Sequence, residues 1–157
     1  NVLDEEALDY LQNNLRILSG FYGILRAFDG VVPYRLEMQA RLACDGYKNL
    51  YTFWNNLLYD ELTKDDGEVL NLASKEYYKA VEPYVKNGVR FVTCVFGTYV
   101  KGKLKVKATE AKMARGEMVR LCAENNVQSV DEVKAYNVRG YVFNEELSSE
   151  TEFVFVK

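Results

Sequence analysis

The stretch VRFVTCVFGTYVKGKLKVK, Val89–Lys107, decides the fold class because it combines a long apolar run with a single turn. Residues 89–100 are rich in β-branched and aromatic side chains, which favour a strand. After Lys101-Gly102, residues 103–107 alternate strictly between lysine and an apolar side chain, as a half-buried strand does. We therefore predict a β-hairpin with one lysine-coated face.

Helical spacing of apolar residues on both sides of this hairpin adds helices to the prediction. The first predicted helix is capped by Asp4 and ends near Asn13-Asn14. A short strand over Leu15–Leu18 and a tight turn then lead into a second helix over Phe21–Phe28. Further helices are predicted from Asp45 to Leu62, from Ser74 to Val81, after a cap at Thr109, and, as a short one, at the capping box of Ser129 with Glu132. Further strands are predicted at Val69–Leu72, Tyr141–Phe143 and Glu152–Val156. The pattern predicts an α+β fold, a single domain over residues 1–157 with a mixed or antiparallel sheet surrounded by helices.

Length and composition bound the class of protein. A chain of 157 residues with 48% hydrophobic content suffices for one domain with a core. Its three cysteines are odd in number and lack CxxC spacing, which is typical of a reducing compartment, so we expect the cytoplasm. No apolar run approaches the ~20 residues that a membrane span needs, so no membrane partner is expected.

The sequence contains no histidine, which excludes Ser-His and Cys-His catalysis and imidazole ligation of metals. No phosphate loop, dinucleotide fingerprint or nucleophile elbow is present, and the carboxylates lack EF-hand spacing. Cys94 and Cys122 lie at positions typical of small core residues. We therefore predict no catalytic residue, no metal and no cofactor.

Basic residues are concentrated between positions 101 and 120, where the sequence contains seven of them and only two acidic residues, Glu110 and Glu117. Although the whole chain carries a net charge of -3, this local surplus could line a groove for a nucleic-acid backbone. The alternative is a solvated strand face whose lysines discourage edge pairing. The candidate nucleic-acid-binding residues are Lys101, Lys103, Lys105, Lys107, Lys112, Arg115 and Arg120.

A second candidate lies in Ser19–Met38, which places arginines beside much apolar surface. A helix beginning after Ser19-Gly20 would offer unpaired N–H groups to an anion, with Arg26 and Arg35 as clamps. Alternatively, Gly20 and Gly23 permit close packing, and Arg26–Asp29 and Arg35–Glu37 are structural ion pairs. The candidate anion- or ligand-binding residues are Ser19, Gly20, Tyr22, Arg26, Tyr34, Arg35 and Glu37.

Several motifs then indicate a family. They are Leu15–Arg26 (LRILSGFYGILR), Pro33–Met38 (PYRLEM), Leu50-Tyr51 with Phe53-Trp54, Asn71–Ser74 with Glu76-Tyr77, Ala114-Arg115-Gly116 with Met118 and Arg120, and Gly140-Tyr141 with Phe143. In order and spacing this set closely resembles the YaaA family of bacterial peroxide-stress-resistance proteins. The resemblance covers essentially the whole chain. Because the chain starts at Asn1 and lacks the family's N-terminal portion, the resemblance also implies a C-terminal fragment of a YaaA-type fold.

The resemblance implies a cytosolic protein that limits oxidative damage, in a family associated with lowered free intracellular iron and with binding of double-stranded DNA through a basic cleft. On this basis we expect the two candidate sets to face one shared cleft, in a DNA-binding stress protein without an assigned reaction. The rival prediction is a small-molecule enzyme or binder with its anion site at the Ser19-Gly20 turn and Glu37 as acid or base. The oligomeric state is left open.

Overall fold

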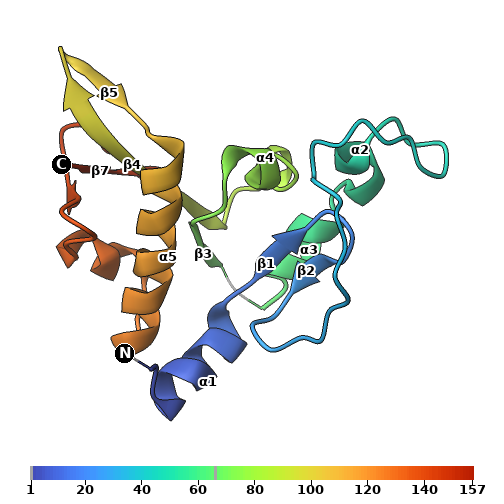
Figure 1. Ribbon diagram of the computed structural model, residues 1–157, viewed down its shortest axis with the longest axis horizontal. Coiled ribbons are helices and arrows are strands. Elements are labelled where there is room, and N and C mark those ends of the chain that lie inside the picture. Colours follow the sequence, from blue (N-terminus) through green and yellow to red (C-terminus); the bar gives the residue numbers. More distant parts are fainter. Residues whose placement is uncertain (1, 66) are drawn as a thin grey trace. The chain divides into compact units, whose positions relative to one another are not determined.

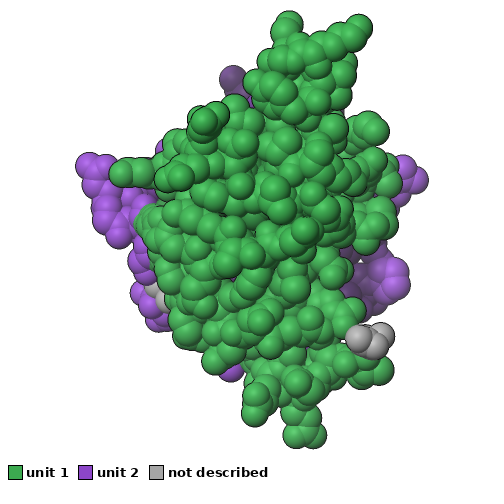
Figure 2. Space-filling model, turned by 90° about the vertical axis from the view of Figure 1, so that its left-hand side faces the viewer, with its two compact units in different colours: residues 1–10, 68–72, 90–157 green, residues 11–67, 73–89 purple. Residues whose placement is uncertain are grey.

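The computed structural model describes residues 2–65 and 67–157. These residues form two compact units. Unit 1 consists of residues 1–10, 68–72 and 90–157, and unit 2 of residues 11–67 and 73–89 (Figure 2). The single domain over 1–157 stays a prediction. Over the described part of the chain, no helix has the length and apolar character that crossing a membrane requires.

Unit 1 is built on a mixed sheet of β3 (Glu68–Asn71), β4 (Arg90–Val100), β7 (Glu152–Val156) and β6 (Val142–Phe143), in that order, with β5 (Lys103–Lys105) also paired to β4 (Figure 1). β4 pairs in parallel with both β3 and β7, whereas β5 and β6 pair antiparallel with their neighbours. Helices accompany this sheet, so the α+β class and the mixed sheet are confirmed.

One face of β4 and β7 packs against the long helix α5 (Ala108–Glu124). Alternate β4 residues point to this face, and Phe96 stacks on Phe155 of β7 with ring centroids 5.2 Å apart. The helix contributes small side chains at helical spacing, which let it approach the sheet closely. The buried α5 residues at this face are Ala111, Ala114, Met118 and Cys122, and the core position predicted for Cys122 is confirmed.

Of the three helix caps predicted at Asp4, Thr109 and Ser129, two are confirmed. α5 begins at Ala108, so its N-cap is Lys107 and the predicted cap at Thr109 is wrong. The capping box of Ser129 with Glu132 is confirmed, but the element that it begins, η2 (Val130–Ala135), is a 3₁₀ helix. At the chain's start, Asp4 accepts a hydrogen bond from the amide of Ala7 at 2.9 Å and begins α1 (Glu5–Asn14), as predicted.

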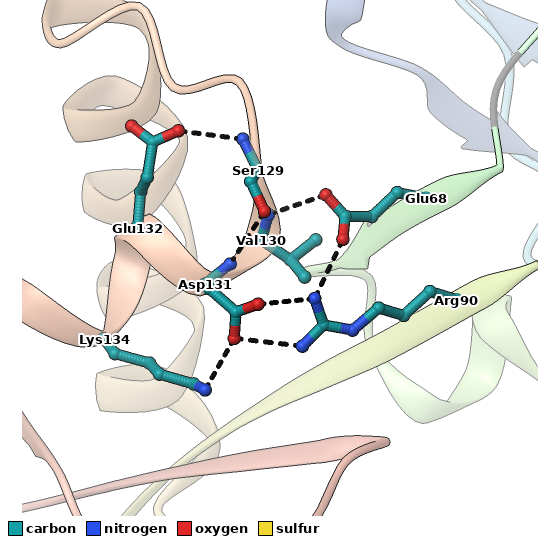
Figure 3. A network of polar contacts seen from close by, with 7 residues as sticks. All are labelled: Glu68, Arg90, Ser129, Val130, Asp131, Glu132 and Lys134. Carbon is teal, nitrogen blue, oxygen red and sulfur yellow. Dashed lines mark hydrogen bonds and ion pairs between the residues drawn. The ribbon is translucent and has the colours of Figure 1, made fainter.

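A polar network fastens η2 to the start of the sheet (Figure 3). The Arg90 guanidinium donates to both carboxylate oxygens of Asp131, at 2.6 and 2.9 Å, and to Glu68 at 3.0 Å. Glu68 also accepts from the amide of Val130 at 2.9 Å, and Lys134 pairs with Asp131 at 2.5 Å. The charges of this network are satisfied within unit 1, so Arg90 has a structural role.

Unit 2 contains a second, two-stranded sheet of β1 (Ile17–Ser19) and β2 (Gly23–Leu25), which pair antiparallel. The helix predicted over Phe21–Phe28 is therefore wrong, because this segment turns back and pairs with β1. Gly23 has a φ of 79°, and a Cβ there would lie 2.9 Å from the ring of Trp54. Both the backbone conformation and the close approach of the indole require glycine at this turn.

The predicted helix from Asp45 to Leu62 is divided in the structure into α2 (Leu50–Trp54) and α3 (Leu57–Thr63). Asn49 caps α2 by accepting from the amide of Thr52 at 3.0 Å, and Asn55 ends it with a φ of 48°. Two short elements follow, α4 (Lys75–Tyr78) and the 3₁₀ helix η1 (Glu82–Tyr84). The helix predicted from Ser74 to Val81 is confirmed at its start, where Ser74 is the N-cap of α4, but it ends at Tyr78, and η1 begins only after Val81.

Candidate nucleic-acid interface

The basic residues of unit 1 are presented by a tight hairpin, residues 98–105, which we call the lysine hairpin. Its turn is Lys101-Gly102, with φ values of 52° and 75°, as a two-residue turn between antiparallel strands requires. β4 pairs with β3 and β7 over residues 90–97 and with β5 over 98–100. The lysine hairpin therefore extends beyond the pairing of β4 with β3 and β7 (Figure 1).

The register determines which face of the hairpin carries the lysines. Lys105 lies opposite Thr98 and Lys103 opposite Val100, and directly opposed residues share a face of the sheet. Thr98 and Val100 continue the alternation of Phe96, so this is the face that β4 turns toward α5. Both lysine side chains are exposed, which confirms the lysine-coated face.

Three of the seven predicted basic residues are engaged with neighbours. Lys107 pairs with Glu110 at 3.6 Å, and Arg120 pairs with Glu124 at 2.8 Å. Arg115 is half-buried, and its charge lowers the pKa of Cys94 against the larger effect of burial. The remaining four, Lys101, Lys103, Lys105 and Lys112, are exposed and form no ion pair within residues 2–65 and 67–157.

The basic residues of α5 do not all share one side of the helix. At 3.6 residues per turn, Arg120 lies about 140° around the axis from Arg115, whereas Lys112 lies about 60° from it. Lys112 lies between them, about 80° around the axis and about 12 Å along it from Arg120, and the Arg120 guanidinium is already paired with Glu124. The basic residues that one ligand could contact together are therefore those of the lysine hairpin and of the first turns of α5.

The acidic residue closest to this set in sequence, Glu110, is neutralised inside unit 1. Its carboxylate binds Lys157 at 2.7 Å and accepts from the hydroxyl of the buried Tyr141 at 3.1 Å. These hydrogen bonds hold the pKa of Glu110 below its ordinary value, so it stays ionised and compensated by Lys157. Glu110 therefore does not cancel the exposed lysines of the hairpin.

Sequence patterning could have found one further side chain in this hairpin. Tyr99 alternates with Thr98 and Val100, so it lies on the face opposite the lysines. Its side chain is 51% exposed. The strict alternation along β4 is the sequence signal that places Tyr99 there.

The predicted anion site of unit 2 lacks the helix on which it was based. Ser19 is buried, and its hydroxyl accepts from the amides of Tyr22 at 3.0 Å and Phe21 at 3.3 Å and contacts the hydroxyl of Tyr34. The N–H groups of the turn thus already have an acceptor within the protein. At Gly20 a Cβ would lie 2.8 Å from the carbonyl oxygen of Leu36, which confirms close packing there.

The charged residues of this stretch are distributed differently from either prediction. Arg26, Arg35 and Glu37 are exposed, and in the described structure neither Arg26–Asp29 nor Arg35–Glu37 is an ion pair. Asp29 instead accepts from the backbone amide of Arg26 at 2.7 Å. Arg26 follows β2 at the open end of the β1–β2 hairpin, away from the Ser19-Gly20 turn. The pKa of Glu61 is lowered chiefly by its hydrogen bond with Lys64 and, to a smaller extent, by the charge of Arg26.

The aromatic residues of this stretch form a cluster. The rings of Phe21, Tyr22 and Tyr34 lie within 4.9 to 5.6 Å of one another, centroid to centroid. The hydroxyl of Tyr22 accepts from the amide of Val32 at 2.9 Å. The structure thus brings Ser19, Gly20, Tyr22 and Tyr34 together, and whether they bind a ligand stays a prediction.

Comparison with known proteins places the chain in a family. A family model described as "Peroxide stress protein YaaA" matches residues 1–147. The chain belongs to the YaaA family. It is 54% identical over 155 residues to a UPF0246 protein of Limosilactobacillus reuteri, covering 99% of this chain and 62% of that protein. A UPF0246 protein of Pediococcus pentosaceus is 52% identical over 157 residues, covering 100% of this chain and 62% of that protein.

The YaaA resemblance predicted from the motifs is therefore confirmed, and the chain spans 62% of the length of these two relatives. The two predicted sets of site residues belong to different units of this YaaA-family chain. A cleft shared between them stays a prediction.

The thiols of this family member fit the core role predicted for two of them. Cys94 and Cys122 are buried, and burial raises the pKa of their thiols to about 12 and about 11. Both are protonated near neutral pH and poor nucleophiles. Cys44 is exposed. Among the residues that the structure describes, no three His, Cys, Asp or Glu side chains gather as a metal site.

Proposed function

We propose that this YaaA-family chain contributes to peroxide-stress resistance by binding double-stranded DNA through the lysine hairpin and the start of α5. The observation that carries the proposal is the exposure of four basic side chains that form no ion pair in the described structure. They are Lys101, Lys103, Lys105 and Lys112. Ammonium groups bind phosphate as point charges, which suits contact with a backbone.

The distribution of charge supports a specific orientation on a polyanion. Residues 101–120 carry seven basic and two acidic side chains, a balance of +5, whereas the whole chain carries -3. The remaining residues therefore carry -3 minus 5, or -8. Such an asymmetric field directs the hairpin toward phosphates and repels them from the rest of the surface.

The rival prediction, an anion site at the Ser19-Gly20 turn, draws less support from the structure. The turn amides already donate to the Ser19 hydroxyl, and Arg26 lies at the other end of the β1–β2 hairpin. Only Arg35 and Glu37 would remain as exposed charged contacts.

The salt dependence of DNA binding tests the proposal. Affinity for a labelled duplex is measured by fluorescence anisotropy between about 50 and 200 mM salt. The variant Lys101→Asn/Lys103→Gln/Lys105→Gln removes three ammonium groups, and asparagine tolerates the positive φ of the turn. At about 0.9 per neutralised phosphate, the slope of log K against log salt should become shallower by about 2.7.

A matched control removes the same charge elsewhere. Lys48, Lys75 and Lys79 are exposed in unit 2, and their joint substitution by glutamine should leave the slope unchanged. The proposal fails if the hairpin variant keeps the wild-type slope, if the control loses as much, or if binding is independent of salt.

We extend the proposal to the cell, where lowered free iron is the accompanying outcome. A strain lacking the gene is complemented with the wild-type sequence, the hairpin variant or the control variant. Survival in hydrogen peroxide and chelatable iron measured by electron paramagnetic resonance should be restored by the wild type and the control but not by the hairpin variant. Restoration by all three would separate the stress role from DNA binding.

A further inference from the structure

The tip of the lysine hairpin carries apolar side chains that the fold does not use. Tyr99 is 51% and Val100 37% exposed. No ring contact or side-chain hydrogen bond involves Tyr99 in the part of the chain that the structure describes. About half of Tyr99 thus stays exposed to solvent and adds nothing to the buried surface that stabilises unit 1.

Leu104, the neighbour of Tyr99 across the hairpin, is less exposed than Tyr99. Leu104 lies opposite Tyr99 in the register, but its side chain covers Gly97, where a Cβ would lie 2.7 Å from Leu104 Cδ1. Leu104 is half-buried as a result. Tyr99 is therefore the outermost side chain on this face of the hairpin.

Positive charge lies at the turn of this hairpin and on the face opposite Tyr99. Lys101 lies in the turn itself, and Lys103 and Lys105 occupy the opposite face of the same two strands. An occupant of the Tyr99 face at this tip must therefore combine apolar or aromatic contact with Tyr99 and negative charge beside Lys101. A nucleic acid with an unstacked base meets both, because every base has a π-face and is flanked by phosphates.

We propose that Tyr99 is a stacking residue that binds an unpaired base, while Lys101 in the turn holds an adjacent phosphate. This inference rests on the proposed DNA binding and adds a preference within it. The chain should bind a duplex containing one unpaired base more tightly than the same duplex fully paired. Base–aromatic stacking predicts a preference of about 5- to 150-fold.

The test compares two probes with a set of Tyr99 variants in the full chain. The probes are a fully paired duplex and the same duplex with one unpaired 2-aminopurine, whose fluorescence falls on stacking. Tyr99→Ala should bind both probes alike and lose the fluorescence change, whereas Tyr99→Phe should keep the preference. Tyr99→Leu keeps apolar bulk without a π-face and should behave as Tyr99→Ala.

Salt dependence separates this inference from the function on which it rests. Stacking neutralises no phosphate, so Tyr99→Ala should keep the wild-type salt slope that the triple lysine variant loses. If the lysine variant also keeps its slope, the proposed function fails. If only the lysine variant behaves as expected and Tyr99→Ala retains the preference, the stacking role alone is refuted.

Two further outcomes would also overturn the stacking role. Wild-type-like behaviour of Tyr99→Leu would show apolar contact in place of stacking. An apolar tip among lysines also suits an anionic membrane, so vesicles of phosphatidylcholine with phosphatidylserine form a separate arm. Loss of vesicle binding in Tyr99→Ala, with the DNA preference intact, would assign the tip to a lipid surface. Hydrogen exchange of the amides of residues 98–100 verifies that the hairpin is formed in each variant.

Discussion

Replacing Gly97 by alanine tests the packing on which the lysine hairpin depends. The new Cβ would lie 2.7 Å from Leu104 Cδ1 and 2.8 Å from Leu104 Cγ, with the carbonyl oxygen of Lys105 at 3.3 Å. Carbon atoms in contact lie about 3.5–4.0 Å apart, so Leu104 must retreat by about 1 Å. Since Cγ is near the start of this side chain, a rotation of its end cannot relieve the clash, and the side chain or β5 itself must move.

The cost can be estimated from this overlap. Inserting a methyl group into a packed position costs about 1–3 kcal/mol. The loss of glycine's freedom in the unfolded chain offsets about 0.4–1 kcal/mol, because the φ of Gly97 is not positive. We expect Gly97→Ala to destabilise the hairpin by about 1–2 kcal/mol. In a Leu104→Ala background the methyl group fills vacated space, so the same change should be neutral or stabilising by up to about 1 kcal/mol.

Native-state hydrogen exchange of the amides of residues 98–100 and 103–105 measures this double-mutant cycle, because the hairpin can open without unfolding the sheet. The expected coupling between Gly97 and Leu104 is about 1–3 kcal/mol. Two single effects that add to within about 0.5 kcal/mol would refute the packing of Leu104 over Gly97. They would also remove the basis for placing Tyr99 outermost on that face.

Three other predictions concern the core, the polar network and the thiols. Phe155→Ala should cost about 3–5 kcal/mol and lower the calorimetric Tm by about 6–20 °C, because the ring is fully buried; a change below 2 °C would contradict the described core. Arg90 holds the pKa of Asp131 well below its ordinary value. The stability that this carboxylate contributes is therefore fully present above about pH 4 and is lost as the pH falls toward the pKa of Asp131 in the folded protein. Below about pH 4, the Tm of Asp131→Asn should therefore fall less steeply with pH than the Tm of the wild type. An unchanged dependence of Tm on pH would refute this contribution of Asp131. Cys44 should react at once with a thiol reagent at neutral pH, whereas Cys94, whose pKa burial raises to about 12, should react only on unfolding; two fast thiols in the native protein would be inconsistent with the buried pair.

The elements that could be predicted from the sequence depend on short-range patterns. The lysine hairpin follows from a period of two and a two-residue turn, and the cap at Asp4 follows from one hydrogen bond three residues along the chain. The capping box at Ser129 is equally local. Such signals do not need knowledge of distant residues, and they were predicted correctly.

The errors lie where distant contacts decide between helix and strand. The residues after Gly23 have apolar spacing that a helix could also use, but the pairing with β1 and the indole of Trp54, 31 positions further along the chain, select a strand. The break at Asn55, with its φ of 48°, likewise divides an apolar stripe that is continuous in the sequence. Arg26 was misplaced relative to the Ser19-Gly20 turn because its position depends on this choice between helix and strand.

The lysine hairpin has a competing structural explanation, in which its lysines only protect the edge strand β5 from pairing with another chain. The two explanations differ in what each lysine must do. Protection requires bulk charge on the strand and is preserved by glutamate as well as by lysine, because either sign opposes a self-association of identical edges. Phosphate binding requires positive charge and is abolished or reversed by glutamate. Lys103→Glu/Lys105→Glu should therefore stay monomeric to the same degree as the wild type while losing DNA affinity, whereas a protein whose DNA affinity survives both glutamates uses these lysines for edge protection alone.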